Sequence, residues 1–128
     1  MITLVRQPTG SRQYGHACLS MITKISIEDI VKVVGHDHST KVKELISILR
    51  VLGHEPSDKL IRVSKKRGLP DVAILITRYS GIKRGNWHWV VLYNKHIYDP
   101  LQWYPIPYEH YIKEWDAQVT SYIKINKL

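Results

Sequence analysis

The chain has 128 residues, of which 44% are hydrophobic and 23% charged, so a single globular domain over residues 1–128 is expected rather than disorder or several domains. No run of about 18 apolar residues could span a membrane, and residues 1–6 lack the pattern of a signal peptide. The single cysteine, Cys18, excludes an internal disulfide, and a cytoplasmic location is therefore expected.

The net charge of +8 makes nucleic acid a partner to consider. However, the lysines and arginines are spread along the chain, and the densest cluster is only Lys65-Lys66-Arg67. There is no helix-turn-helix, zinc-finger or RNP pattern. A solvated basic surface is the favoured interpretation, and binding of nucleic acid or of an acidic partner stays open as an alternative.

The N-terminal half follows helical periodicity after a short expected strand at residues 2–6. Three helices are predicted, over residues 14–23, from an N-cap at Ser26 to a stop at Gly35, and from Ser39 or Thr40 to Gly53.

The second half changes to strand-like patterns. We predict a strand over 59–63, a central strand over 72–77, a polar loop over 80–86, a hairpin over 87–100, an extended segment over 104–107, a short helix over 108–115 and a final strand over 119–125. Helices first and strands second indicate an α+β fold, with the helices packed on one face of a mostly antiparallel sheet.

The hairpin has a predictable register if Asn94-Lys95 forms a two-residue turn. The expected cross-strand pairs are then Tyr93 with His96, Leu92 with Ile97 and Val90 with Asp99. Opposed residues share a face and side chains alternate along a strand, so His88 lies on the same face as Asp99. The two are diagonal neighbours, roughly 7–8 Å apart at their Cα atoms and within side-chain reach.

A carboxylate that orients an imidazole is part of the triad used in nucleophilic catalysis. A thiol nucleophile works best at a helix N-terminus, where the helix dipole stabilises negative charge. Cys18 is the only thiol, and it lies about one turn inside a helix that begins at Tyr14.

Four motifs of the chain occur in the order shown by one peptidase family. They are Val5-Arg6-Gln7, the spacing Gly15-x-Ala17-x-Leu19-x-Met21, His88-Trp89-Val90-Val91 and Tyr98-Asp99-Pro100. Over roughly residues 3–105 the chain therefore resembles the papain-like double-glycine peptidases, which process bacteriocin leader peptides in ABC exporters. Similar stand-alone proteins occur in phages and bacteria, so the resemblance also implies a phage or mobile-element origin and, in that case, the host cytoplasm.

The resemblance implies a papain-like core and assigns roles to individual residues. Gln7 matches the oxyanion-hole glutamine, and His88 and Asp99 match the catalytic pair. Tyr14 stands where the family has its nucleophilic cysteine, and Cys18 falls one turn later. Some exporter domains of the family, such as that of the haemolysin exporter, also have tyrosine there, look inactive as peptidases and bind transport substrate.

Our leading hypothesis is therefore a pseudoenzyme that binds a peptide or protein segment without thiol proteolysis. Because a phenol is mostly un-ionised at neutral pH, it is a poor nucleophile, and Tyr14 is expected to line the cleft. Gln13 and Trp89 are the other residues expected to contribute to binding.

Two alternatives stay open. In the first, the protein is an active cysteine hydrolase with Cys18 as nucleophile, His88 as general base, Asp99 as orienter and Gln7 or Gln13 as oxyanion donor. If Cys18 is not a nucleophile, it is expected to be a small apolar residue buried on its helix. In the second, a basic surface binds nucleic acid or inhibits a protein partner.

Other side chains are expected to be structural. Trp87, Trp89 and Tyr93 lie on the hairpin face opposite His88 and are expected in the core. The histidines His36, His38 and His54 raise the idea of a metal site, but cysteine and acidic partners at metal-ligand spacing are missing. Neither a metal nor another cofactor is expected.

Overall fold

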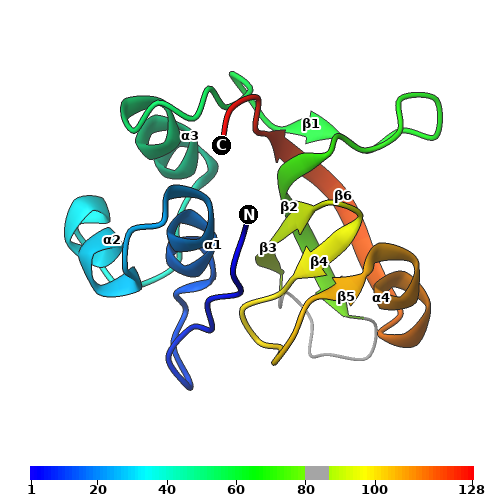
Figure 1. The fold of residues 1–128 in the computed structure, drawn as a ribbon, viewed down its shortest axis with the longest axis horizontal. Helices are drawn as coiled ribbons and strands as arrows, with labels where there is room; N and C mark the ends of the chain where they lie inside the picture. Colours follow the sequence, from blue (N-terminus) through cyan, green and yellow to red (C-terminus); the bar gives the residue numbers. More distant parts are fainter. Residues whose placement is uncertain (80–86) are drawn as a thin grey trace.

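A computed structural model of the chain describes residues 1–79 and 87–128. Three helices come first and a sheet with a fourth helix follows (Figure 1). The helices are α1 (Tyr14–Thr23), α2 (Ile27–Val34), α3 (Val42–Val51) and α4 (Tyr108–Glu114). The strands are β1 (Ile61–Arg62), β2 (Val72–Tyr79), β3 (His88–Tyr93), β4 (His96–Tyr98), β5 (Ile106–Pro107) and β6 (Ala117–Lys124).

The six strands form one antiparallel sheet in the order β1-β6-β2-β3-β4-β5. The α+β prediction is confirmed, and β2 is a central strand, as its continuous apolar sequence predicted. The final strand β6 does not lie at an edge, because it inserts between β1 and β2 and pairs along most of β2.

The two faces of the sheet pack against different helices (Figure 1). Side chains alternate along β2, so Ile74 joins the core formed with α1, α2 and α3, whereas Ala73 and Leu75 pack in a second core with Tyr111 of α4. The three N-terminal helices α1–α3 thus share one face of the sheet, as predicted. Helix α4, which was predicted over 108–115, lies on the other face, because the chain crosses to that face after β5.

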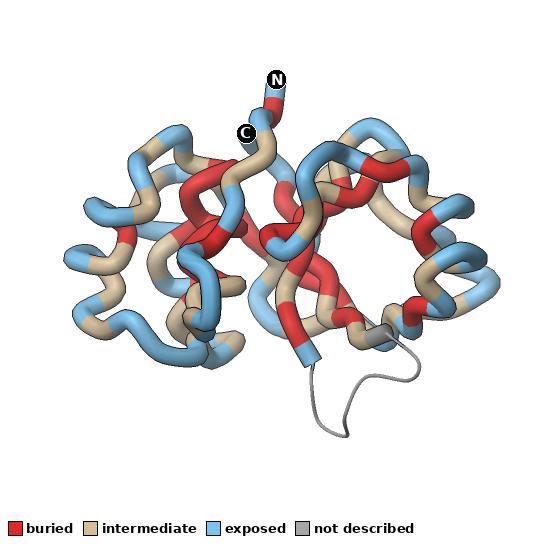
Figure 2. The backbone as a smooth tube through the Cα atoms, turned by 90° about the horizontal axis from the view of Figure 1, so that it is seen from below, coloured by how far each residue is buried: buried red, intermediate tan, exposed pale blue. Residues whose placement is uncertain are grey.

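Helix α1 is the most enclosed helix of the protein. Its residues from Gly15 to Ile22 are all buried, whereas α2 has only Ile30 buried (Figure 2). A helix that is covered on several sides needs small or apolar side chains around its whole circumference, which explains its low polarity. The sheet, the two neighbouring helices and the N-terminal segment provide this cover.

The predicted capping signals act as expected at α2. The side chain of Ser26 accepts a hydrogen bond of 3.2 Å from the backbone N–H of Asp29, and Gly35 ends the helix with a φ of 92°. Helix α3 begins at Val42, later than predicted, because the Glu44 carboxylate accepts a 2.8 Å hydrogen bond from the N–H of Lys41 and makes that residue the N-cap.

The hairpin forms in the predicted register. Asn94 and Lys95 have φ values of 49° and 62°, as the two positions of a type I′ turn require. The pairs Tyr93–His96 and Leu92–Ile97 are both present. Asp99 therefore follows directly after the last residue of β4.

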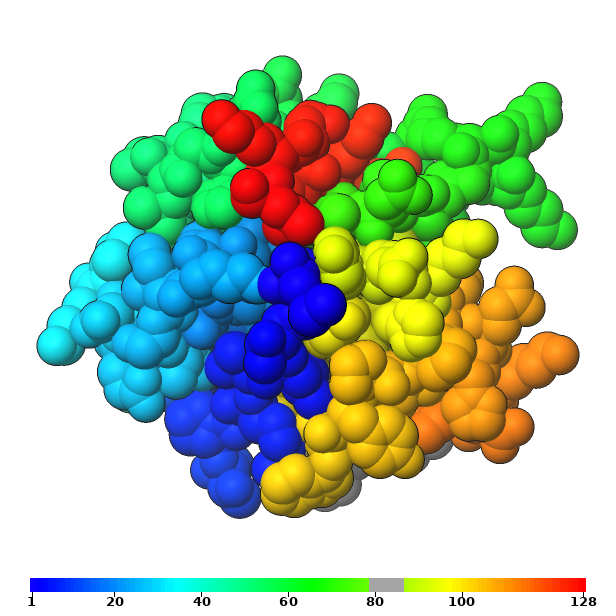
Figure 3. Space-filling model, in the orientation of Figure 1, coloured from blue at the N-terminus to red at the C-terminus, as the bar shows by residue number. Residues whose placement is uncertain are grey.

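Residues 2–6 do not form the expected strand. This N-terminal segment instead lies between the helices and the hairpin (Figure 3). Ile2 is buried against the core of α1–α3, and Leu4 and Val5 pack against that core. Strand β1 is also shorter than predicted, and the predicted loop 80–86 lies outside the described residues. Within the described residues, no helix is both long and apolar enough to cross a membrane.

Candidate functional site

The predicted pair of His88 and Asp99 forms a direct hydrogen bond. Nε2 of His88 lies 3.0 Å from Oδ2 of Asp99, and both side chains are almost completely buried. His88 is the first residue of β3 and Asp99 follows β4, so the two-residue turn of the hairpin fixes their relative position. The proximity deduced from the hairpin register is thus confirmed.

Two further donors hold the carboxylate of Asp99. The backbone N–H of Leu101 donates to Oδ1 and the hydroxyl of Tyr111 donates to Oδ2, each over 2.9 Å. The contact with Leu101 is common in turns, where an aspartate side chain accepts a hydrogen bond from the backbone N–H two residues later. Sequence reasoning missed the contact with Tyr111, since a tyrosine in a short helix carries no signal that names its partner.

Tyr14 occupies the N-terminus of α1 and faces the histidine. The ring centroids of Tyr14 and His88 are 5.1 Å apart, with an angle of 43° between the planes. Because Nε2 of His88 is bonded to Asp99, Nδ1 is on the opposite edge of the imidazole. The order in space is therefore a tyrosine at a helix N-terminus, an imidazole and a buried carboxylate.

Cys18 lies one turn further along α1, inside the core. Its exposed fraction is 0%, and burial, together with the nearby charge of Asp99, raises the pKa of the thiol well above its ordinary value. A nucleophilic cysteine needs a lowered pKa and access to substrate. Cys18 has neither property in this structure, and its burial fits the interpretation of a small apolar core residue.

Gln7 lies close to the site but is not arranged as an oxyanion donor. Its Nε2 donates to the carbonyl oxygen of Ser11 over 2.8 Å and lies 3.4 Å from the hydroxyl of the same residue. Its Oε1 is buried and has no hydrogen-bond partner among the described residues. The backbone N–H of Gln7 donates to the carbonyl of Pro100, which places this segment next to Asp99. The amide N–H groups of Gln7 are thus engaged by Ser11.

The remaining predicted binding residues differ in their surroundings. Gln13 is the N-cap of α1 but makes no side-chain capping hydrogen bond. Trp89 is half-buried and packs against the core of α1–α3, as expected. Trp87 was expected in the core but is 39% exposed, because it lies at the end of the sheet, with the Arg78 guanidinium 4.8 Å above its ring.

Two surface hollows meet at Tyr14. One, of about 210 Å³, is lined by side chains that include Thr40, Trp87, His88 and Trp89. The other, of about 350 Å³, is lined by Arg6, Gln7 and the loop that precedes α1. Tyr14 and Arg12 line both hollows, and no described acidic residue lines either. We call these two neighbouring hollows the cleft, and His88 lines the smaller of them.

The histidines considered as metal ligands have other contacts. His36 pairs with Glu44 over 2.6 Å and stacks on His38, and the buried His16 lies 2.7 Å from the carbonyl oxygen of His36. His54 donates to the carbonyl of Lys127 at the C-terminus. Among the described residues, no group of three potential ligands is arranged to hold a metal ion.

No model of a known protein family matches the chain, and no curated protein matches it.

Proposed function

We propose that this protein is a papain-like, double-glycine-peptidase-like domain that has lost its nucleophile and uses the cleft around Tyr14 to bind a peptide or protein segment. The observation that carries the proposal is the contact between Tyr14 and His88, with centroids 5.1 Å apart. It places a phenol where the resemblance implies a catalytic thiol, beside an imidazole still held by Asp99.

The chemistry of the cleft supports binding rather than hydrolysis. Hydrolysis through a covalent intermediate needs a nucleophile that gives up its proton to the imidazole. The only thiol of the chain, Cys18, is buried and its pKa is raised, and the Gln7 amide has both hydrogens directed to Ser11. His88, Asp99 and Gln7 thus correspond to catalytic residues of the family, but the site has neither a reactive nucleophile nor an amide donor directed at an oxyanion.

The lining of the cleft suits a peptide. Trp87, Trp89 and Tyr14 offer apolar surface with polar edges, and such rings give binding surfaces much of their affinity. Arg6 and Arg12 add positive charge without a described acidic neighbour in the lining, which favours acidic side chains or a carboxylate in the bound segment.

The proposal is tested by selecting peptides from a displayed random library on the wild-type protein. Selected peptides are then titrated against two matched variants, Ser39→Trp in the cleft wall and Ser47→Trp on the exposed side of α3. We expect Ser39→Trp to weaken binding by about tenfold or more, since a filled cleft loses the contacts of its core. Ser47→Trp should leave the affinity unchanged.

Two results would overturn the proposal. One is a selection that enriches no peptide above the background of uncoated support. The other is a set of selected peptides that bind both tryptophan variants as tightly as the wild type. Circular dichroism of both variants establishes that they are folded before the comparison is made.

A further inference from the structure

A basic hollow lies at the end of the sheet away from His88. It has a volume of about 540 Å³ and is built from β1, β6 and the segment that leads into β2. We call it the basic hollow and define it by its four cations, Lys59, Arg62, Arg67 and Lys124. Lys124 pairs with Ala73 near the start of β2, whereas His88 pairs with Thr77 near its end, so the basic hollow is separate from the cleft.

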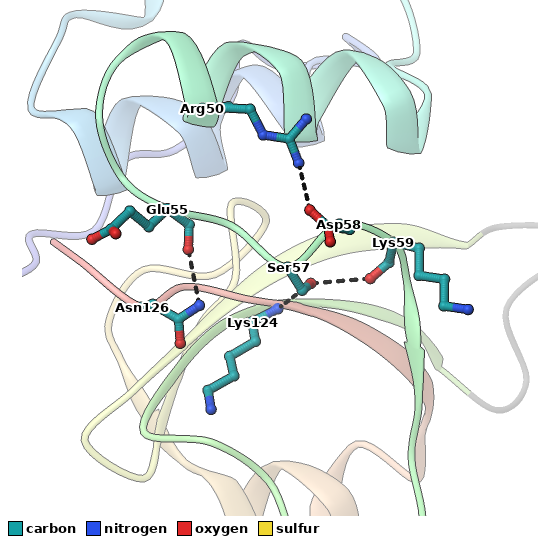
Figure 4. Close-up of polar contacts among 7 residues, drawn as sticks. All are labelled: Arg50, Glu55, Ser57, Asp58, Lys59, Lys124 and Asn126. Carbon is teal, nitrogen blue, oxygen red and sulfur yellow. Dashed lines mark hydrogen bonds and ion pairs between the residues drawn. The ribbon is translucent and has the colours of Figure 1, made fainter.

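The cations of the basic hollow have no ion-pair partner within residues 1–79 and 87–128. No described acidic residue lines the hollow. The nearest acidic residue in sequence, Asp58, pairs with Arg50 of α3 over 3.0 Å, and the side chains of Lys59 and Lys124 extend away from that pair (Figure 4). Four positive charges therefore face solvent around one depression.

The backbone beneath these cations is held in place. The hydroxyl of Ser57 donates to the carbonyl of Lys59 over 3.0 Å and accepts from the N–H of Lys124 over 3.1 Å (Figure 4). These contacts tie the segment before β1 to the last residue of β6. The exposed Lys65 and Lys66 continue the positive charge on the segment between β1 and β2, which projects from the body of the molecule (Figure 3).

The composition of the basic hollow narrows the class of ligand. Its one aromatic side chain, Tyr122, is only 2% exposed and offers no ring face for stacking on unpaired bases. Leu60, Ile61, Leu69 and Pro70 also line the hollow, but they are half-buried and none is among the large exposed hydrophobic side chains of the described chain, so the exposed side chains of the hollow are its four cations. What it offers is positive charge, which recognises phosphates regardless of base sequence.

We propose that the basic hollow, through Arg62, Arg67, Lys59 and Lys124, binds the phosphate backbone of double-stranded nucleic acid. The site is independent of the cleft at Tyr14, so the protein has a second binding surface with different chemistry. Because the contacts are to phosphates, binding is insensitive to base sequence and weakens steeply as salt increases.

The test uses fluorescence anisotropy with labelled duplexes of about 20 base pairs, in DNA and in RNA, and with the corresponding single strands. The variant Arg62→Ala/Arg67→Ala is compared with the charge-matched control Lys43→Ala/Lys113→Ala, whose lysines are exposed on α3 and α4 outside the hollow. We expect the wild type to bind at least one duplex. The hollow variant should bind about tenfold or more weakly at 0.1 M salt, with a logarithmic salt slope reduced by about 2.

The control variant should stay within about twofold of the wild type at the same salt concentration. The proposal fails if no duplex binds, or if the two double variants lose affinity equally, which would mean that only the net charge matters. It also fails if the single strands bind more tightly than the duplexes. Thermal melting of each variant confirms that the fold is intact.

Discussion

Tyr111 donates a hydrogen bond of 2.9 Å to Oδ2 of Asp99, the same oxygen that lies 3.0 Å from Nε2 of His88. The tyrosine belongs to α4 and packs in the core on the far face of the sheet from α1. The hydrogen bond between Tyr111 and Asp99 thus joins that core to the candidate site. The buried carboxylate of Asp99 is held by Tyr111 and by His88. A buried carboxylate is stable only when donors replace its lost hydration, which gives Tyr111 a structural role at this site.

The variant Tyr111→Phe tests this role. It keeps the ring in the core and removes the hydroxyl that reaches Asp99, so we expect the free energy of unfolding to fall by about 1–3 kcal/mol. Urea denaturation measures the change. The control is Tyr108→Phe, one turn earlier in the same helix, whose hydroxyl makes no hydrogen bond within the described chain and which should change stability much less. Equal losses in the two variants would contradict the role given to Tyr111.

Replacing Tyr14 by cysteine should create a reactive thiol. The position lies at the N-terminus of α1 and faces His88, so both the helix dipole and the imidazole favour the thiolate there. In a Cys18→Ala background, Tyr14→Cys should react with iodoacetamide at neutral pH about tenfold faster than the wild type. Mass spectrometry of the alkylated protein over time gives both rates.

The wild type is the matched control, because its only thiol, Cys18, is buried and should label slowly in the folded state. Adding His88→Ala to the Tyr14→Cys variant should slow labelling again, since the thiolate then loses its partner. Rapid labelling of Cys18 in the native protein would contradict the geometry described above. So would a Tyr14→Cys variant whose reactivity is the same with and without His88.

Features set by local sequence patterns could be predicted, whereas features set by packing between distant segments could not. The contact between His88 and Asp99 was predictable, because a two-residue turn leaves one register for the hairpin. The bounds of α2 followed from its capping residues Ser26 and Gly35, whereas the start of α3 did not match the predicted cap. The depth of Cys18 was not predictable, since it depends on which side of α1 the sheet covers. The contact of Tyr111 and the insertion of β6 beside β2 likewise depend on segments distant in sequence.

The variant Gly15→Ala should destabilise the protein although alanine favours helices. A Cβ atom at this position would lie 1.9 Å from Oγ1 of Thr40 and 3.1 Å from Cδ2 of Leu45. Helix propensity favours the change by about 1 kcal/mol, but overpacking costs about 1–3 kcal/mol and should prevail. Thermal or urea denaturation measures the net loss. Adding Thr40→Ala removes the shortest contact and should restore part of the stability, whereas a Gly15→Ala variant more stable than wild type would contradict the close approach.

The protein should lose stability in mild acid because of His16. Burial is the main cause that lowers the pKa of His16 below the ordinary histidine value, and the charge of neighbouring His36 adds to it, although the hydrogen bond to the His36 carbonyl and the charges of Glu44 and Asp37 oppose the shift. The unfolded chain therefore takes up a proton at a higher pH than the folded protein does. The stabilisation is complete above the ordinary histidine pKa of about 6.5 and is lost as pH falls toward the lowered value, by about 1.4 kcal/mol for each unit of difference.

Urea denaturation at a series of pH values from about 7.5 down to 5 measures this dependence. The variant His16→Gln keeps an N–H donor within reach of the carbonyl of His36, which His16 contacts at 2.7 Å, but cannot titrate. Its stability should fall less than that of the wild type over the same interval. The matched control is His54→Gln, because His54 also donates to a backbone carbonyl but lies outside this histidine cluster. A His16→Gln variant with the same acid sensitivity as wild type would place the titrating group elsewhere.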